Sequence, residues 1–563
     1  MNCSLLSCRM GFHLLLFLIL SSIHGILAQD LAEVTIVVKG ATTIAETRDD
    51  FICATIDWWP PEKCDYQQCP WGNSSILNLD LSHPLLAKAI QAFKPLRIRI
   101  GGSLQDKVVY GVGNLSSSCL PFRKIAGGLF GFSKGCLPVA RWDEVNNLFS
   151  KTGASVTFGL NALYGRNNTQ NGAWVGAWDP TNACDFIKYT ISKGYQVDSW
   201  EFGNELSGNG VGASVSAQQY GKDLINIKAL IDELYGKSND KPLIVAPGGF
   251  YDQQWFTKFL QVSGPDVVNV VTHHIYNLGP GNDPNLVKTI LNPQQLSQIS
   301  QTFSSLEDTI QQNGPWASAW VGESGGAYNS GGRLVSDTFV NSFWYLDQLG
   351  MSSMYNTKTY CRQTLIGGNY GLLNTTTFAP NPDYYSALLW HQLMGKGVLA
   401  VDGDSSQFLR AYAHCSKGRE GMTLLLINFS NVTQFRITVQ NSMNIDLHVK
   451  ENAIYRDSSF KRGLKRAVQW VGRKASDEEE LREEYHLTPK DGYIQSQTMV
   501  LNGIPLELTE DGDIPTLEPV LVDVKSPISI APLSIAFAVL PNFEAQACGR
   551  IESNYQLHIH KLH

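Results

Sequence analysis

Between about residues 51 and 360, short apolar segments alternate with longer amphipathic ones. The stretches Gln218–Leu234 and Val335–Leu349 have the apolar spacing of helices, and β-branched runs separate such stretches. Strands that alternate with helices are typical of a parallel sheet, and eight of them predict a closed (β/α)8 barrel, the TIM barrel. The predicted strands are Phe51–Ile56, Leu96–Ile100, Ser155–Leu160, Val197–Phe202, Leu243–Ala246, Val268–His273, Ala319–Gly322 and Met354–Thr359.

After about Trp390 the pattern changes to alternating segments separated by turns, which predicts an antiparallel β-sandwich. Its predicted strands include Thr423–Phe429, Phe435–Val439, Gln497–Leu501 and Ile535–Leu540. The segment Glu33–Val38 is also strand-like, and we expect it to pair with this C-terminal sheet. The charge-dense stretch Arg473–Glu484 is interpreted as a solvated insertion. The predicted units are a strand over 29–44, the barrel over 45–390, the β-sandwich over 391–549 and a flexible tail over 550–563.

The fourth and the seventh predicted barrel strands each end in a glutamate. Asn204 and Glu205 follow the fourth strand, and Glu323 ends the seventh. Side chains at the C-terminal ends of barrel strands form the active site of this fold, so we expect the two carboxyl groups to lie close together. A retaining glycosidase needs such a pair about 5–5.5 Å apart, one as acid/base and one as nucleophile. Two unrelated strand-end glutamates are the alternative.

These two carboxyl groups would need different protonation states. Glu205 must carry a proton to donate it to a leaving oxygen, and Glu323 must be ionised to attack an anomeric carbon. Burial beside Trp200 and Phe202, together with the negative charge of Glu323, is expected to raise the pKa of Glu205.

The first residues have the pattern of a secretory signal peptide. Arg9 precedes the mostly apolar run Phe12–Leu20, and Gly25 or Ala28 offers a small residue for cleavage, which predicts a signal over residues 1–28. A membrane anchor is the alternative, but the run is shorter than the roughly 20 residues of a span. We therefore expect a secreted protein of the extracellular space or cell wall, or one of the lysosome or vacuole. Peripheral membrane association is left open.

Cysteines and glycosylation motifs fit an oxidising compartment. Of the 11 cysteines, Cys3 and Cys8 leave with the signal, so an odd number stays and at least one thiol is expected to be free. Asn-x-Ser/Thr motifs are candidate glycosylation sites in such a protein. They begin at Asn73, Asn114, Asn167, Asn374, Asn428 and Asn431.

Charge and composition exclude some partners. The formal net charge is −7 and no dense run of Lys and Arg occurs, which argues against binding to nucleic acid. The histidines lack the spacing to a carboxylate or cysteine partner that a metal site uses, so no metal and no cofactor is expected. Aromatic residues are plentiful, but most aromatic side chains are core residues, so their number decides little.

Several motifs in a fixed order resemble the heparanase and β-glucuronidase group, glycoside hydrolase family 79, and in particular its plant heparanase-like members. They run through the barrel and, more weakly, into the β-domain. The motifs are Leu96–Gly102, Phe158–Leu163, Trp200–Glu205, His273-His274, Val321–Glu323, Ser336–Phe339 and Gly367–Tyr370.

The resemblance implies Glu205 as acid/base and Glu323 as nucleophile. It also implies further residues that bind the sugar, with Asn204 and Asp57 at hydroxyl groups, His273 near the nucleophile, and Gln363 and Tyr370 near the bound uronic acid. Tyr276, beside the His-His motif, is a further candidate for substrate binding. The alternatives are a barrel histidine that holds a backbone carbonyl, and ordinary packing tyrosines. In the β-domain, the resemblance implies a disulfide between Cys415 and Cys548.

The chain departs from the animal heparanases in several places. Ile275 stands where those enzymes have an aromatic residue, the loop Tyr328–Gly332 differs, and neither long Lys-rich heparin-binding segments nor a large excised linker is evident. The expected protein is a secreted, single-chain, monomeric retaining β-glucuronidase. Its expected substrates are glucuronosyl groups of proteoglycans or of small aglycones such as flavones. The alternatives are an endo-acting heparanase-type hydrolase of polyanionic glycans and a catalytically silent cell-surface glycan-binding protein.

Overall fold

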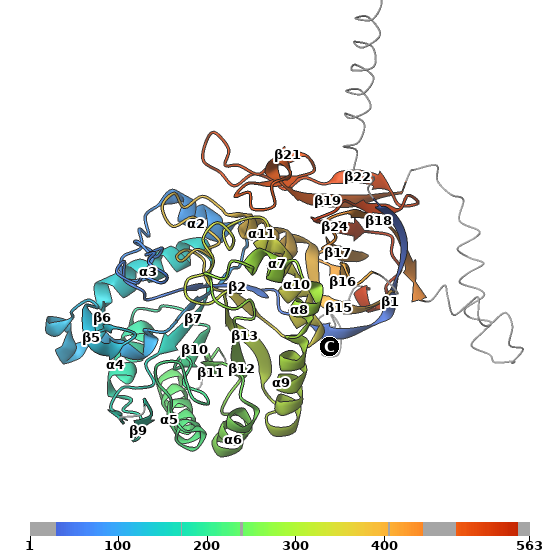
Figure 1. The fold of residues 1–563 in the computed structure, drawn as a ribbon. Helices are drawn as coiled ribbons and strands as arrows, with labels where there is room; N and C mark the ends of the chain where they lie inside the picture. Colours follow the sequence, from blue (N-terminus) through green and yellow to red (C-terminus); the bar gives the residue numbers. More distant parts are fainter. Residues whose placement is uncertain (1–29, 170–171, 237–239, 404–405, 443–479, 550–563) are drawn as a thin grey trace, which may run out of the picture.

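The computed structural model describes residues 30–169, 172–236, 240–403, 406–442 and 480–549. Eight parallel strands close into a barrel in chain order, as the sequence predicts. Figure 1 shows this barrel beside a second unit built of strands. The barrel strands are β2 (Ile52–Ile56), β3 (Arg97–Ile100), β7 (Ser155–Leu160), β10 (Ser199–Phe202), β11 (Leu243–Gly249), β12 (Val270–Ile275), β13 (Ser318–Ser324) and β14 (Tyr360–Arg362).

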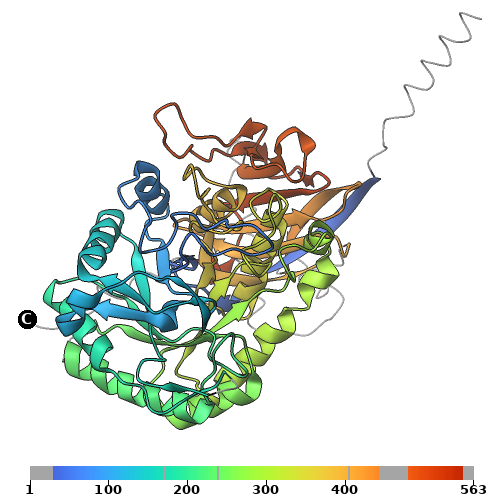
Figure 2. The same cartoon turned by 60° about the vertical axis from the view of Figure 1, so that its left-hand side comes forward.

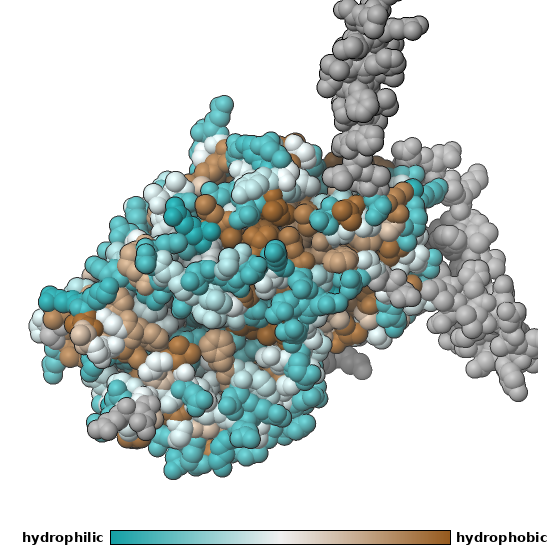
Figure 3. Space-filling view, in the orientation of Figure 1, coloured by the Kyte–Doolittle hydropathy of each residue, from teal (hydrophilic) through white to brown (hydrophobic). Residues whose placement is uncertain are grey.

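Helices surround the barrel and form its outer rim in the turned view (Figure 2). The solvent-facing sides of α6 and α9 are mainly hydrophilic (Figure 3), as expected for helices that bury one face against a sheet. The helices are α2 (Pro84–Gln91), α3 (Val139–Thr152), α4 (Thr181–Ser192), α5 (Ala217–Tyr235), α6 (Gln253–Ser263), α7 (Leu286–Ile290), α8 (Pro293–Ser297), α9 (Ser300–Asn313), α10 (Asn341–Met354) and α11 (Pro382–Leu393).

Helices α10 and α11 are buried on almost every side because they lie between the barrel and the second unit. Gly350 of α10 shows how closely the units pack, since a Cβ atom there would lie 2.3 Å from the ring of Tyr412. This burial explains two wrong predictions. The predicted helix Val335–Leu349 begins too early, because residues 335–340 form turns and α10 begins at Asn341. The predicted strand Met354–Thr359 is also wrong, because α10 continues to Met354 and the eighth strand is β14. An all-round apolar helix has no amphipathic period that would mark its ends.

Strand β3 places two arginine side chains inside the barrel. Arg97 and Arg99 point inward, because successive side chains of a strand point to opposite faces. Arg97 bonds to Asp50 at 3.0 Å and to Asp198 at 2.6 Å in the lower part of the barrel. Both arginines are at most 1% exposed. Arg99 lies one layer higher, toward the C-terminal ends of the strands.

The second unit is an 11-stranded mixed sheet that includes the N-terminal strand. In Figure 1 the blue strand β1 lies among the orange and red strands of this sheet. It pairs antiparallel with β15 and parallel with β18, so the expected all-antiparallel pattern is wrong for one pair. Side chains of β1, β18 and β23 share one core with those of β16, β17 and β24, as in a sandwich. The strands are β1 (Asp30–Glu46), β15 (Met394–Asp402), β16 (Leu409–Ser416), β17 (Met422–Asn428), β18 (Thr433–Asn441), β19 (Leu481–Pro489), β20 (Met499–Leu501), β21 (Ile504–Pro505), β22 (Val520–Asp523), β23 (Ile528–Ile530) and β24 (Ser534–Leu540).

The interpretation of Arg473–Glu484 as a solvated insertion is wrong at its C-terminal end. Arg482 and Glu484 belong to β19, are at most 5% exposed, and bond to each other over 2.6 Å. Arg482 also donates to the carbonyl groups of Asp523 and Ser526. The charged residues at this end of the segment are therefore buried and paired within the sheet. The predicted signal peptide and the predicted tail over 550–563 lie outside the described residues. Within the described ranges, no helix is long and apolar enough to cross a membrane.

Four disulfides connect the described chain. Cys415 and Cys548 are joined across the second unit, in agreement with the expected pair. Cys53 and Cys361 are joined across the neighbouring strands β2 and β14, where the last barrel strand meets the first. The remaining pairs are Cys64–Cys69 and Cys119–Cys136. Among the described cysteines, Cys184 alone has a free thiol, as the odd number requires. Such a set of disulfides is typical of a protein that folds in an oxidising compartment.

Candidate active site

Glu205 and Glu323 meet at the C-terminal end of the barrel, after β10 and at the end of β13. One carboxylate oxygen of each and one ring nitrogen of His274 all lie within 4.8 Å of one another. Each of the three residues is at most 6% exposed. The separation of the carboxyl groups is close to the roughly 5–5.5 Å of retaining glycosidases and shorter than the roughly 6.5–9.5 Å of inverting ones.

The backbone of Glu205 adopts a left-handed conformation with φ +54°, which is uncommon for a residue with a side chain. Two backbone hydrogen bonds hold it there. Its N–H donates to the carbonyl of Gly248 at 2.6 Å, and its carbonyl accepts from the N–H of Val211 at 2.9 Å. Its side chain lies with Oε1 3.0 Å from Nδ1 of His274. The strained turn therefore aims this carboxyl group at the barrel axis.

Burial raises the pKa of Glu205 to about 7, although the nearby Arg99 opposes the rise. The expected rise is present, but its expected surroundings are different. Trp200 and Phe202 point outward, because Trp200 packs on Phe158 and Phe202 on Trp178. His274 contacts Glu205 instead. Burial also lowers the pKa of His274 to about 3, so this imidazole is neutral at physiological pH.

Glu323 is held by two donors, one on β3 and one directly after β12. Arg99 Nη1 donates to its Oε2 at 2.8 Å, and the Tyr276 hydroxyl donates to its Oε1 at 2.6 Å. Together the two donors fix the orientation of this carboxyl group. Tyr276, expected to bind substrate, thus directly contacts the proposed nucleophile.

Arg99 joins three residues at the floor of the site. Besides Glu323 it donates to Oε2 of Glu201 at 2.7 Å and to Oδ1 of Asn204 at 2.8 Å. Glu201 is fully buried, and burial raises the pKa of its carboxyl group. A guanidinium group has enough donors in a planar fork to serve all three acceptors, whereas an ammonium group does not have this geometry.

Asp106 fixes the backbone beside the two strand ends. It lies in the 3₁₀ turn Gln105–Lys107 after β3, and its oxygens accept from the backbone N–H groups of Ala162 at 2.7 Å and Asn204 at 2.8 Å. Burial raises the pKa of Asp106 to about 7. Asn204, directly before Glu205, is therefore held by both its backbone and its side chain.

On the opposite side of the site, Asp57 and Gln363 follow β2 and β14. Gln363 Nε2 donates to Oδ2 of Asp57 at 2.9 Å, and its Oε1 accepts from the hydroxyl of Thr55. Burial and the charge of Glu323 raise the pKa of Asp57 to about 7. Gly102 has φ +119° and faces this carboxylate, and a Cβ atom there would lie 2.3 Å from Asp57 Oδ2.

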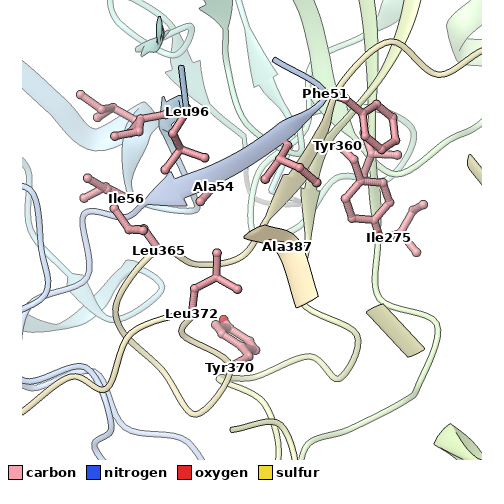
Figure 4. Close-up of a cluster of buried hydrophobic side chains, with 14 of the residues drawn as sticks. Phe51, Ala54, Ile56, Leu96, Ile275, Tyr360, Leu365, Tyr370, Leu372 and Ala387 are labelled. Atoms are coloured by element: carbon pink, nitrogen blue, oxygen red, sulfur yellow. The ribbon is translucent and has the colours of Figure 1, made fainter. Parts of the chain in front are cut away.

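Tyr370 lies at the edge of the core around β2. Figure 4 shows its ring next to Leu372, near Leu365. The ring packs edge-on against Trp71 with centroids 6.2 Å apart. Its electrostatic neighbours include Glu323 and Asp57, and its side chain is 3% exposed. Tyr370 thus combines packing with a place at the site.

His273 does not belong to the site, so its expected place near the nucleophile is wrong. Its ring packs edge-on against Phe303 of α9 with centroids 5.6 Å apart, and neither ring nitrogen has a hydrogen-bond partner among the residues that the structure describes. Alternation along β12 sends His273 outward and the next residue, His274, inward. Burial lowers the pKa of His273 to about 3. The neutral ring is a core residue.

Two loops at this end of the barrel are joined by hydrogen bonds. Ser330 Oγ donates to Oδ2 of Asp65 at 2.5 Å and accepts from Trp71 Nε1 at 2.9 Å. Asn329 Nδ2 donates to the hydroxyl of Tyr66 at 3.1 Å. We call Asp65, Tyr66, Asn329 and Ser330 the loop bridge. It connects the loops after β2 and β13, so it crosses the edge of the barrel at which the intervening strand β14 ends.

Glu205, His274 and Glu323 also have the composition of a metal site. Within the described residues, the guanidinium of Arg99 lies 2.8 Å from Glu323 and already supplies positive charge to this carboxylate. A cation bound by these three side chains would lie beside that guanidinium and be repelled by it. The arrangement suits proton transfer and nucleophilic attack better than metal binding.

The candidate glycosylation sites differ in exposure. Asn73, Asn114, Asn167 and Asn431 are exposed, and Asn374 is half-buried. Asn428 is fully buried, and its Nδ2 donates to the carbonyl groups of Thr433 and Ala531 at 2.8 Å. The prediction of a glycan at Asn428 is therefore wrong for the folded chain.

Sequence reasoning missed Arg99, Glu201, Asp106 and His274. A signal for Arg99 was present, because in the strand Arg97–Ile100 arginine alternates with isoleucine, which places both arginines on one face. Glu201 precedes the acid/base candidate on the inward face of β10. Asp106 has no such pattern, since it acts from a turn on backbone groups distant in sequence.

Comparisons with known proteins support the resemblance. A family model described as glycosyl hydrolase family 79, N-terminal domain, matches residues 33–350. Heparanase-like protein 1 of Arabidopsis thaliana is 63% identical over 523 residues, which cover 93% of this chain and 96% of that protein. Baicalin-β-D-glucuronidase of Scutellaria baicalensis is 39% identical, with 90% of this chain and 92% of that protein covered. A solved 4-O-α-L-rhamnosyl-β-D-glucuronidase from Fusarium oxysporum 12S shares the fold, with a TM-score of 0.60 at 14% identity over 90% of this chain and 100% of that one. The chain belongs to glycosyl hydrolase family 79 and is a glycoside hydrolase.

Proposed function

We propose that this protein is a retaining β-glucuronidase in which Glu323 is the nucleophile and Glu205 the acid/base. The observation that carries the proposal is the pair itself, with carboxylate oxygens within 4.8 Å at the C-terminal end of the barrel. Their surroundings separate the two roles. Two donors bind the carboxyl oxygens of Glu323, whereas burial raises the pKa of Glu205 and favours its protonated form.

In the first step Glu323 attacks the anomeric carbon while Glu205 donates its proton to the leaving oxygen. The bond to the aglycone breaks, and a glycosyl ester of Glu323 forms. In the second step Glu205, now ionised, takes a proton from water, whose oxygen attacks the anomeric carbon. The bond between this carbon and the Glu323 oxygen breaks, which releases the sugar and the Glu323 carboxylate. The neutral imidazole of His274 suits both states, because Nδ1 can accept from a protonated Glu205 or donate to an ionised one.

The names of the relatives support glucuronic acid as the transferred sugar. They include heparanase-like proteins, a baicalin-β-D-glucuronidase and a hyaluronoglucuronidase. In this chain Asn204, Asp57 and Gln363 offer hydrogen bonds to hydroxyl groups of the sugar. Tyr370 lies on the same side, where the carboxylate of the uronic acid would be bound.

The loop bridge favours removal of a terminal sugar over cleavage within a chain. The leaving group must lie beside Glu205, which follows the fourth barrel strand, because this residue protonates it. The opposite edge of the ring of strands, at β14, would receive the non-reducing side of the sugar. The loop bridge crosses that edge and would block a longer chain there. We therefore propose exo action. We also propose that the protein is a monomer and that it is secreted or delivered to the lysosome or vacuole.

The test is hydrolysis of 4-nitrophenyl β-D-glucuronide by the purified protein, followed by NMR of the first sugar released. Retention predicts the β-anomer as the first product. A 2-fluoro glucuronide should trap the ester, and peptide mass spectrometry should find the label on Glu323. Matched substrates with glucose in place of glucuronic acid control for sugar specificity.

An α-anomer as first product, or a label on another residue, would refute the assigned roles. Equal rates on the glucoside and the glucuronide would refute the sugar. If the protein and its Glu323→Gln variant both lack activity but bind glucuronides equally, the silent glycan-binding alternative replaces the enzyme. Release of internal fragments from a uronic-acid polysaccharide would refute exo action alone.

A further inference from the structure

Phe250 is an exposed aromatic residue at the catalytic end of the barrel. It directly follows β11, whose last five residues are each buried, yet Phe250 itself is 41% exposed. Single exposed apolar side chains are common on protein surfaces, so it is the place of this ring at the mouth of the site that bears on function. Its position is therefore informative about what the site binds.

The ring lies beside the two residues that hold the catalytic carboxyl groups. Its centroid is 6.4 Å from that of His274, which contacts Glu205, and 6.3 Å from that of Tyr276, which donates to Glu323. Its backbone is fixed as well, because the carbonyl of Phe250 accepts from Ser207 Oγ at 2.9 Å. The ring thus has a defined place next to the reacting groups.

The side on which Phe250 lies assigns it to the leaving group. It adjoins the turn that carries Glu205, since a Cβ atom on Gly249 would lie 3.2 Å from the Cα of Glu205. The acid/base must lie beside the leaving oxygen. In the proposed function the sugar would lie toward Asp57 and Gln363, which follow β2 and β14 on the far side of the barrel axis. A group attached to the leaving oxygen would therefore meet the Phe250 ring.

The charge near Phe250 does not suit a sulfated glycan. Residues 246–258 contain one acidic residue, Asp252, and one basic residue, Lys258. Asp252 caps α6 by accepting from the N–H of Trp255 at 2.9 Å, and its Oδ2 would lie 3.2 Å from a Cβ on Gly208 of the same rim. This segment therefore offers no basic cluster to bind a polyanion, and an uncharged aromatic group needs none.

We propose that Phe250 is the platform for the aglycone and that the preferred substrates are glucuronides of aromatic alcohols. This rests on the proposed function and specifies its substrate class. An aromatic aglycone would stack on the exposed ring in an offset or edge-on arrangement and cover its apolar surface. The sugar is bound by other residues, so Phe250 contributes to the choice of aglycone and not to the chemistry.

The test compares Phe250→Ala with the wild type on 2-naphthyl β-glucuronide and on methyl β-glucuronide. For each substrate, kcat/KM of the wild type is divided by kcat/KM of the variant. This ratio removes the intrinsic difference in reactivity between the two leaving groups. We expect kcat/KM for the naphthyl substrate to fall about tenfold, mainly through KM, and that for the methyl substrate to change less than about twofold. Phe250→Trp should keep the preference.

Tyr328→Ala is the matched control, because Tyr328 is 42% exposed and lies on the loop after β13. It should leave the ratio between the two substrates unchanged. As a second measurement on the unaltered protein, 2-naphthol should inhibit competitively, and a sulfated disaccharide should not. This inhibition measurement tests the proposal even if Phe250→Ala fails to fold.

Equal losses on both substrates, or no inhibition of the wild type by 2-naphthol, would overturn the platform. A wrong proposed function would give a different result, because Glu323→Gln would keep its activity on both substrates. A protein in which Glu323→Gln is inactive and Phe250→Ala shows no selectivity keeps the function and loses only the platform.

Discussion

The guanidinium of Arg99 lies 2.8 Å from the carboxylate of Glu323, with both side chains buried at the C-terminal end of the barrel. The same guanidinium neutralises Glu201 and bonds to Asn204. One cation therefore sets the position of the proposed nucleophile and of the residue next to the acid/base. The formation of the glycosyl ester removes one negative charge from this cluster without removing its partner.

Arg99→Lys should lower kcat by about a hundredfold or more, because an ammonium group cannot reach all three acceptors and a small displacement of Glu323 is costly. Steady-state kinetics on 4-nitrophenyl β-glucuronide measure this effect. Arg97→Lys is the matched control, two residues earlier on the same face, and should reduce stability without a comparable loss of kcat. A kcat of Arg99→Lys within threefold of wild type would contradict the assigned role.

Glu323→Ala should lower turnover by roughly 10⁴-fold or more. Added azide can fill the space and attack from the opposite face, which gives the inverted glycosyl azide. Glu205→Ala should instead accumulate glycosyl-enzyme on a nitrophenyl substrate, and azide should restore turnover with retained configuration, because azide needs no base. NMR of the azide products distinguishes the variants, and an inverted product from Glu205→Ala would reverse the roles.

His274→Ala and His273→Leu should separate two adjacent histidines. Loss of the His274 contact with Glu205 should lower kcat on the order of tenfold, which equals about 1.4 kcal/mol, and shift the basic limb of the pH profile. Within the described part of the chain His273 has no hydrogen-bond partner, so leucine should be tolerated with full activity. Measurement of kcat against pH for both variants tests this pair. An inactive, folded His273→Leu protein would contradict the assignment of this residue to the core.

Activity should have an acidic optimum and fall as the pH rises through about 7. Burial raises the pKa of Glu205 to about 7, and the first step needs its proton. The rate of a substrate with a poor leaving group should follow this limb closely. A nitrophenyl substrate, which needs less acid assistance, should show a weaker dependence. Flat activity from about pH 4 to 8 would contradict the two-carboxylate mechanism.

Stability should also be lower at neutral than at mildly acidic pH. Glu205, Asp57 and Asp106 each have a pKa raised to about 7 by burial, from 4.5 or 3.8. The folded state therefore binds more protons than the unfolded state between about pH 4 and 7, and its stability falls as the pH rises across this window. Thermal unfolding at pH 5 and 7.5 measures the change. Glu205→Gln removes one group and should make the dependence shallower, and an unchanged slope would count against it.

Glycan mapping by mass spectrometry should find no glycan at Asn428, whose side chain is buried in the sheet. The exposed residues Asn73, Asn114, Asn167 and Asn431 should carry glycans when the protein is made in a secretory pathway. Asn428→Gln should reduce stability without a loss of glycan mass. A glycan found at Asn428 on folded protein would contradict the described sheet.

Much of the barrel could be predicted because its strands are apolar runs between amphipathic helices, and the ends of β10 and β13 bear the carboxylates. The last strand could not, because β14 has three residues and follows a helix that is buried on almost every side. Side-chain direction was harder still. A one-residue shift exchanges His273 with His274, and nothing in a run of two histidines says which points inward.

The parallel pairing of β1 with β18 links the beginning of the chain to a part that is synthesised much later. Val34 is paired with Ile437, and the whole barrel lies between them in sequence. During synthesis β1 must wait until about 350 further residues have been made before β15 is complete, and about 400 before β18 is complete. The barrel alone would meanwhile expose the sheet-facing sides of α10 and α11. Final assembly of the enzyme therefore depends on the completion of its C-terminal sheet, and truncation within that sheet should impair the barrel as well.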